Sequence, residues 1–222
     1  RANDTGSESS VLTRSIVITG VPGSMVRFTA QDPLAPSARI VPVRVLGRCG
    51  GYTSDIADAI TWASGGTVSG VPANANPAEV INLSLGGGGT CSSTYQTAIN
   101  GAVGRGTTVV VAAGNSNTNV SSSVPANCPN VIAVAATTSA GSRASFSNYG
   151  TGIDISAPGQ SILSTLNTGT TTPGSASYAS YNGTSMAAPH VAGVVALMQA
   201  AAASPLTPAA VESTLKSTAR PL

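Results

Sequence analysis

Short apolar runs alternate with segments of helical periodicity along most of the chain. Residues 107–113 are almost continuously apolar, as in a strand buried on both faces. Residues 54–63 instead repeat apolar positions at helical spacing, for example Ile56 and Ile60. The patterns predict strands at 39–46, 80–85, 107–113, 131–136 and 152–156, and helices at 54–63, 94–103, 185–201 and 207–217. This order predicts an α/β fold, a parallel sheet flanked by helices on both faces.

The amino-terminal 33 residues do not follow this pattern. They hold one alternating apolar stretch, 15–19, followed by turn-forming glycines and a proline. We therefore expect a divergent segment at 1–33 and a domain at 34–222. Sites in parallel α/β sheets form at the carboxyl ends of strands. The glycine-rich segments 86–89 and 114–115 follow two predicted strands, so we expect a site there.

Composition narrows the class of protein. Of the 222 residues, 41% are hydrophobic and 8% are charged, with a net charge of +2, which argues against a disordered chain. The ten basic residues form no run, so we expect no nucleic-acid partner. No apolar stretch reaches the roughly 18 residues that span a bilayer, so we expect no membrane partner. Residues 1–5 lack the apolar core of a signal peptide, so the targeting segment of a secreted protein would lie upstream.

Two polar residues lie where chemistry could occur. Ser185 begins a predicted helix after Asn182 and Gly183, close to free backbone N–H groups, although serine at a helix start is also an ordinary N-cap. Asn115 follows a buried strand, where its amide could donate to an oxyanion. Gly-Asn after a strand is equally ordinary turn chemistry. Position alone leaves both alternatives open.

Longer segments decide between them. Residues 109–115 (VVVAAGN) and 182–193 (NGTSMAAPHVAG) closely resemble segments of subtilisin-like serine proteases. The same holds for 80–86 (VINLSLG), 144–150 (ASFSNYG) and 155–159 (ISAPG). Their order and spacing also agree, over about residues 38–222. The chain is most similar to extracellular subtilases of Gram-negative bacteria.

This resemblance implies the site residues. Ser185 would be the nucleophile, and Asn115 would form the oxyanion hole together with the Ser185 N–H. Ser84, Leu85 and Gly86 would form an edge that pairs with an extended polypeptide substrate and borders the first specificity pocket. Ala112, Ala113 and Gly114 would form the other wall of that pocket. Because small residues in that wall leave room for a sizeable apolar side chain, we expect broad specificity. The predicted function is therefore that of a serine endopeptidase.

The base that such a nucleophile needs is not found in the chain. The family carries catalytic Asp and His in segments before the strand at Arg39, and neither segment appears here. Asp4-Thr5-Gly6 has the letters of the family's Asp turn without its preceding strand. The only histidine, His190, lies five residues after Ser185 on the same helix, and we expect it to be structural. We therefore expect a subtilisin-like domain whose amino-terminal portion is truncated or replaced, leaving apolar sheet surface exposed unless another segment covers it.

Three functions remain open at this stage. The chain could be an endopeptidase, an inactive remnant that at most binds extended peptides, or an esterase or acyl-transfer enzyme that uses Ser185 and Asn115. We expect a secreted monomer that requires no cofactor. Calcium is a possible structural ion, but no dense acidic loop indicates its site. The resemblance also implies a Cys91–Cys128 disulfide, which leaves Cys49 without a partner.

Overall fold

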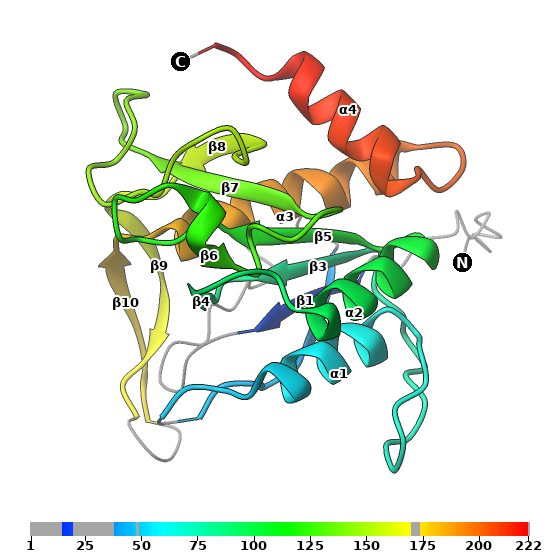
Figure 1. The fold of residues 1–222 in the computed structure, drawn as a ribbon. Helices are drawn as coiled ribbons and strands as arrows, with labels where there is room; N and C mark the ends of the chain where they lie inside the picture. The colour runs from blue at the N-terminus through cyan, green and yellow to red at the C-terminus, as the bar shows by residue number, and fades with distance from the viewer. Residues whose placement is uncertain (1–14, 20–37, 48, 170–173, 222) are drawn as a thin grey trace, which may run out of the picture.

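The computed structural model describes residues 15–19, 38–47, 49–169 and 174–221. Its centre is a six-stranded sheet in which all neighbouring strands are parallel (Figure 1). In sheet order the strands are β2 (Arg39–Pro42), β1 (Ser15–Thr19), β3 (Val80–Leu83), β5 (Thr108–Ala112), β7 (Ile132–Thr137) and β8 (Ile155–Pro158). The predicted α/β class is therefore confirmed.

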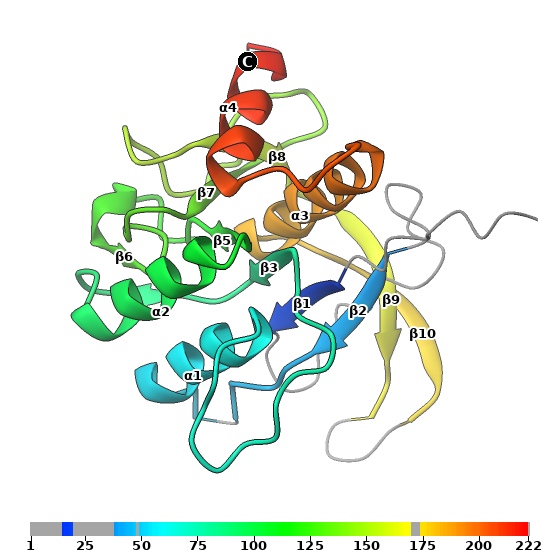
Figure 2. The ribbon, with the colours of Figure 1, turned by 90° about the vertical axis from the view of Figure 1, so that its right-hand side faces the viewer.

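Helices cover both faces of the sheet. On one face lie α1 (Thr53–Ala63) and α2 (Ser93–Gly104), and on the other lie α3 (Thr184–Ala201) and α4 (Pro208–Thr218) (Figure 2). Alternate residues of a strand serve opposite cores: Val111 packs with α1 and α2, whereas Val110 packs with α3. This double burial explains why β5 and β7 are buried along their whole length.

The observed elements differ from the predicted ones mainly in strand length. The strand predicted at 39–46 ends at Pro42, and the one predicted at 152–156 runs from Ile155 to Pro158. Two antiparallel pairs were not predicted. One is β9 (Ile162–Asn167) with β10 (Ala176–Tyr181), and the other is β4 (Gly87–Gly88) with β6 (Ser123–Val124), which follows the 3-10 helix η1 (Val120–Ser122).

Strand β1 comes from the segment that was expected to be divergent. It lies between β2 and β3, with Val17 in register with Val41 on one side and Ile81 on the other. The predicted boundary after residue 33 falls among residues 20–37, outside the described residues, as does Asp4-Thr5-Gly6.

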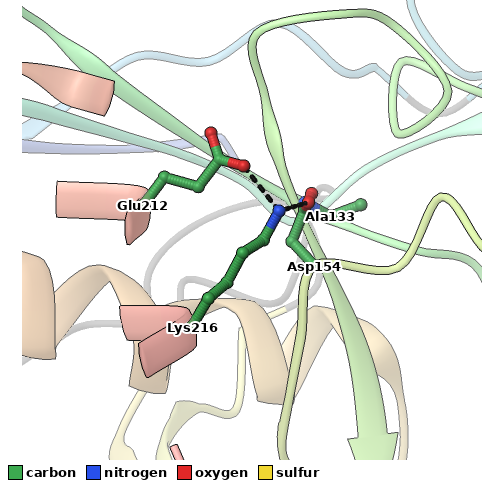
Figure 3. Close-up of polar contacts among 4 residues, drawn as sticks. All are labelled: Ala133, Asp154, Glu212 and Lys216. Carbon is green, nitrogen blue, oxygen red and sulfur yellow. Dashed lines mark hydrogen bonds and ion pairs between the residues drawn. The ribbon is translucent and has the colours of Figure 1, made fainter. Parts of the chain in front are cut away.

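The carboxy-terminal helix is tied to the sheet by charge. Lys216 on α4 contacts the carboxylates of Asp154 and Glu212, each at 2.6 Å, while Asp154 also accepts a hydrogen bond from Ala133 N at 2.8 Å (Figure 3). The hydrogen bonds that Lys216 donates, first to Asp154 and then to Glu212, raise its pKa above 10.5. Asp154 therefore has a structural role, since it binds both Lys216 of α4 and the backbone of β7.

The predicted disulfide is confirmed. Cys91, before α2, is bonded to Cys128, before β7, with 5.1 Å between their Cα atoms. The bridge links the segments that follow β4 and β6. Cys49 is a free, exposed thiol.

Candidate active site

Ser185 is the second residue of α3, at the carboxyl edge of the sheet. The two segments that approach it follow β3 and β5, which are neighbours in the sheet with Leu83 opposite Val111. Ser185 is half-buried. As a first-turn residue, Ser185 has a backbone N–H without an intrahelical acceptor. Helix α3 therefore presents a hydroxyl and an N–H donor at the same place.

Ser84 and Ser185 bond to each other in both directions. The Ser84 hydroxyl donates to the Ser185 carbonyl at 2.8 Å, and the Ser185 hydroxyl donates to the Ser84 carbonyl at 3.4 Å. In an α-helix the Ser185 carbonyl would accept a hydrogen bond from the N–H of residue 189. Residue 189 is a proline and has no N–H, so the Ser185 carbonyl is free to accept from Ser84. Asn82 in turn donates to the Ser84 hydroxyl at 2.9 Å. This chain fixes the first turn of α3 against the end of β3.

Asn115 is held by its oxygen, which leaves its amide group pointing elsewhere. Oδ1 accepts from Thr184 N at 2.8 Å and from the Thr184 hydroxyl at 3.0 Å. The same hydroxyl accepts from Gly114 N at 3.0 Å. Because one side of the side chain is fixed by Thr184, the Nδ2 donors face away from Thr184. Thr184 itself is fully buried.

Gly183 shows where that amide points. A Cβ built on Gly183 would lie 3.6 Å from Asn115 Nδ2 and 3.6 Å from Ser185 N. The two nitrogen atoms therefore lie beside the same position, which the Met186 sulfur also approaches at 3.5 Å and which glycine leaves without a side chain. Asn115 is exposed and Ser185 is half-buried, whereas Gly183 is buried. Two donors converging beside a hydroxyl are the arrangement that stabilises an oxyanion.

The predicted pocket walls contribute mainly backbone. The side chains of Leu85 and Ala113 lie in the core beneath α1 and α2, and that of Ala112 lies in the core beneath α3. Gly86 packs against the β6 carbonyl of Val124, and Gly114 lies against the side chain of Asn148. In the 112–114 wall, the N–H groups of Ala113 and Gly114 are already bonded, to the Val134 carbonyl and the Thr184 hydroxyl.

His190 lies on α3 but is bonded to its own helix. Its Nδ1 is 2.7 Å from the Met186 carbonyl, one turn back. Ser185 Oγ, in contrast, has the Ser84 carbonyl as its partner. Because His190 is the chain's only histidine, no imidazole is hydrogen-bonded to Ser185.

Comparisons with known proteins identify the family. The sequence profile of the Subtilase family matches residues 19–222. The chain belongs to the subtilase family. The subtilase match begins 19 residues before the resemblance described above and includes the end of β1.

Individual relatives of this subtilase are extracellular proteases. It is 79% identical over 188 residues to an extracellular protease of Xanthomonas campestris, covering 85% of this chain and 32% of the relative. It is 52% identical to an extracellular basic protease of Dichelobacter nodosus, covering 76% of this chain and 28% of the relative. A protease structure from Pseudoalteromonas arctica is 57% identical with a TM-score of 0.83, covering 85% of this chain and 58% of that one. The chain thus spans about a third of the length of these two sequence relatives.

The described residues of this subtilase show no cluster of three or more His, Cys, Asp or Glu side chains that could hold a metal. Because calcium also accepts backbone and amide carbonyl ligands, the calcium expectation stays untested. Among the same residues, no helix is long and apolar enough to cross a membrane.

Sequence reasoning missed three residues that shape the subtilase site. Thr184 orients Asn115, Pro189 frees the Ser185 carbonyl, and Asn148 contacts the segment that carries Asn115. All three lie in segments that carried the family resemblance. Their roles depend on contacts between residues far apart in the chain, and only the missing N–H of Pro189 could have been noted from the sequence.

Proposed function

We propose that Ser185 is the nucleophile of a serine endopeptidase site and that Asn115 Nδ2 and Ser185 N form its oxyanion hole. The observation that carries the proposal is that Asn115 Nδ2 and Ser185 N lie beside the same position, each 3.6 Å from a Cβ built on Gly183. We propose further that this chain alone turns over substrate near background, because no imidazole contacts Ser185.

The chemistry divides into a part that these residues supply and a part that they do not. As Ser185 Oγ bonds to the scissile carbonyl carbon, the carbonyl oxygen becomes an oxyanion that accepts from Asn115 Nδ2 and Ser185 N. The hydroxyl proton would have to pass to water, since no base is in place. Collapse of the tetrahedral intermediate expels the amine, and water later releases the acyl group. Loss of the histidine in a subtilisin lowers turnover by about 10⁶-fold and leaves roughly 10³–10⁴-fold over water.

The substrate class follows from the backbone walls. An extended polypeptide can pair with the backbone of 84–86, as a strand added to an edge, while 112–114 borders it on the other side. Wall side chains that are buried in the core select little, which supports broad specificity. We also propose that the protein is secreted and monomeric, as extracellular relatives and the disulfide suggest.

The second candidate is a protein that binds extended peptides without cleaving them. The absence of an imidazole at Ser185 favours it. An esterase would use Ser185 and Asn115 in the same way, and it would also need a histidine base that does not contact Ser185 here. Cleavage of an activated ester with no cleavage of peptides would favour the esterase.

A fluorophosphonate probe tests the proposal. In the reaction, Ser185 Oγ bonds to phosphorus, the P–F bond breaks, and the hydroxyl proton passes to water. We expect slow labelling over hours at high probe concentration, followed by intact mass and mapped to Ser185. The Ser185→Ala variant should remain unlabelled. Binding of an uncleavable extended peptide, measured by calorimetry, should persist in both proteins.

Two results would overturn parts of the proposal. Rapid stoichiometric labelling of Ser185 would mean that a base acts on it, and the near-background expectation would be wrong. Labelling of the parent no faster than that of Ser185→Ala would remove the nucleophile assignment. Peptide binding together with that second result would leave the binding protein as the function.

A further inference from the structure

Asn115, the proposed oxyanion donor, lies on an irregular segment outside any helix or strand. Residues 113–118 leave β5 with Gly114 at φ +103° and Asn117 at φ +50°, both in the left-handed region. Asn115 is exposed, and so are Ser116 and Thr118. An exposed irregular segment keeps one conformation only if other parts of the protein hold it.

A single buried side chain makes contacts on both sides of Asn115. The Oδ1 of Asn148 accepts from Ser116 N at 3.0 Å and from Thr118 N at 3.1 Å. Its Nδ2 donates to the Ala113 carbonyl at 2.8 Å and to the Ser123 hydroxyl at 2.7 Å. Asn148 is 1% exposed, so these bonds replace water that it cannot reach.

Asn148 is itself fixed to the sheet. Its backbone N–H donates to the Gly114 carbonyl at 3.0 Å. The neighbouring Ser147 hydroxyl donates to the Asn148 carbonyl at 3.0 Å and accepts from Ala136 N, in β7, at 2.9 Å. The loop that carries Asn115 is therefore tied to a buried strand through a rigid intermediary.

The fit between Asn148 and the loop is close. A Cβ on Gly114 would collide with Asn148 Nδ2, so only glycine allows the side chain to lie there. The positive φ of Gly114 also favours glycine. Gly114 thus allows both the close contact with the Asn148 side chain and the turn that carries Asn115.

We propose that Asn148 is a positioning residue that holds the Asn115 amide in the oxyanion hole through its contacts with residues 113, 116 and 118. This inference rests on the proposed function. It adds a residue that touches neither substrate nor nucleophile and that acts only through Asn115.

A double-mutant cycle on the slow phosphonylation of Ser185 tests the inference. A misplaced donor should lower the labelling rate of Asn148→Ala by about 10- to 100-fold. In an Asn115→Ala background the same change should lower the rate by about twofold or less, since the donor is already absent. A general structural defect would lower the rate equally in both backgrounds, and that result would overturn the inference.

Asn74 provides a matched control. Its side chain also clamps an irregular segment, by donating to the Ala63 carbonyl and accepting from Asn76 N, but at the end of α1. Asn74→Ala should label at the parental rate. Equal labelling of the parent and a folded Asn148→Ala would overturn the positioning role alone. Labelling of the parent no faster than that of Ser185→Ala would overturn the proposed function and this role together.

A second variant covers the case in which Asn148→Ala does not fold. Asn148→Asp keeps an oxygen acceptor for Ser116 N and Thr118 N and should label within about threefold of the parent at neutral pH, where burial favours the neutral carboxyl. Hydrogen exchange gives a readout that does not depend on labelling. The Ser116 and Thr118 amides should exchange faster in Asn148→Ala or Asn148→Ser and stay protected in Asn148→Asp. Unchanged protection in every folded variant would overturn the inference.

Discussion

Thr184 determines at the residue scale how Asn115 points. Its hydroxyl donates to Asn115 Oδ1 and accepts from Gly114 N. Thr184→Val keeps the shape of the side chain and removes both bonds. We expect labelling of Ser185 to slow by about tenfold, because the hydrogen bond to Asn115 contributes about 1–1.5 kcal/mol.

Thr184→Ser is the control for this change, since it keeps the hydroxyl. It should label at nearly the parental rate, and thermal unfolding should show both variants folded. Equal rates for Thr184→Val and the parent would show that Asn115 does not depend on the Thr184 hydroxyl, since the Thr184 N–H remains in both.

The role of His190 is also decided at the residue scale. Its Nδ1 contacts the Met186 carbonyl in its own helix, so it cannot take the Ser185 proton in this geometry. His190→Gln should leave the labelling rate of Ser185 unchanged within about twofold and cost about 1 kcal/mol of unfolding free energy from the lost bond. Intact mass and urea denaturation measure the two effects. A tenfold or larger loss of labelling, roughly 1.4 kcal/mol, would make His190 the base.

At the scale of elements, helices were predicted better than strands. The predicted helices 54–63 and 185–201 each begin within one residue of the observed α1 and α3. Helical periodicity is a local signal that extends over many residues. Strand lengths and the β9–β10 hairpin depend on pairing partners far along the chain, so local patterning did not indicate them.

The candidate site divides in the same way. The family resemblance pointed to Ser185 and Asn115, whereas the contacts that orient them join residues about 30 to 100 positions apart. Thr184 and Asn148 carry no pattern that distinguishes an orienting residue from a helix-start or turn residue. Only the folded sheet brings Asn148 to the end of β5.

The ion pair between Lys216 of α4 and Asp154 should make the stability of the protein depend on pH. Since the pKa of Lys216 is raised, mainly by Asp154, the stabilisation is complete below the unfolded value of 10.5 and disappears as pH rises through the folded-state pKa. Lys216 is 44% exposed, so Lys216→Met should lower the unfolding free energy at neutral pH by only about 0.5–1 kcal/mol. Urea denaturation should find this difference lost at strongly alkaline pH. Lys216→Arg should resemble the parent at neutral pH, and a difference between parent and Lys216→Met that persists at alkaline pH would contradict the pairing.

At the scale of the whole molecule, the sheet depends on a strand from the segment expected to be divergent. β1 pairs with β2 on one side and β3 on the other, so it joins β2 to the rest of the sheet. Its residues, Ser15 to Thr19, include no carboxylate and no histidine. Strand β1 therefore completes the sheet but supplies no catalytic acid or base. The sheet can fold with β1 in place while Ser185 still lacks a base.

A proline at the centre of β1 tests whether the sheet needs this strand. Val17→Pro removes an N–H from a strand paired on both sides and should cost about 3 kcal/mol or more of unfolding free energy. Ser15→Pro changes the first residue of the strand, where proline is tolerated, and should remain close to the parent. Thermal unfolding followed by circular dichroism should show a cooperative transition for the parent and Ser15→Pro, and a transition lowered or lost in Val17→Pro. An unchanged transition in Val17→Pro would mean that the sheet forms without β1. Another segment would then have to pair with β2 and β3 in its place.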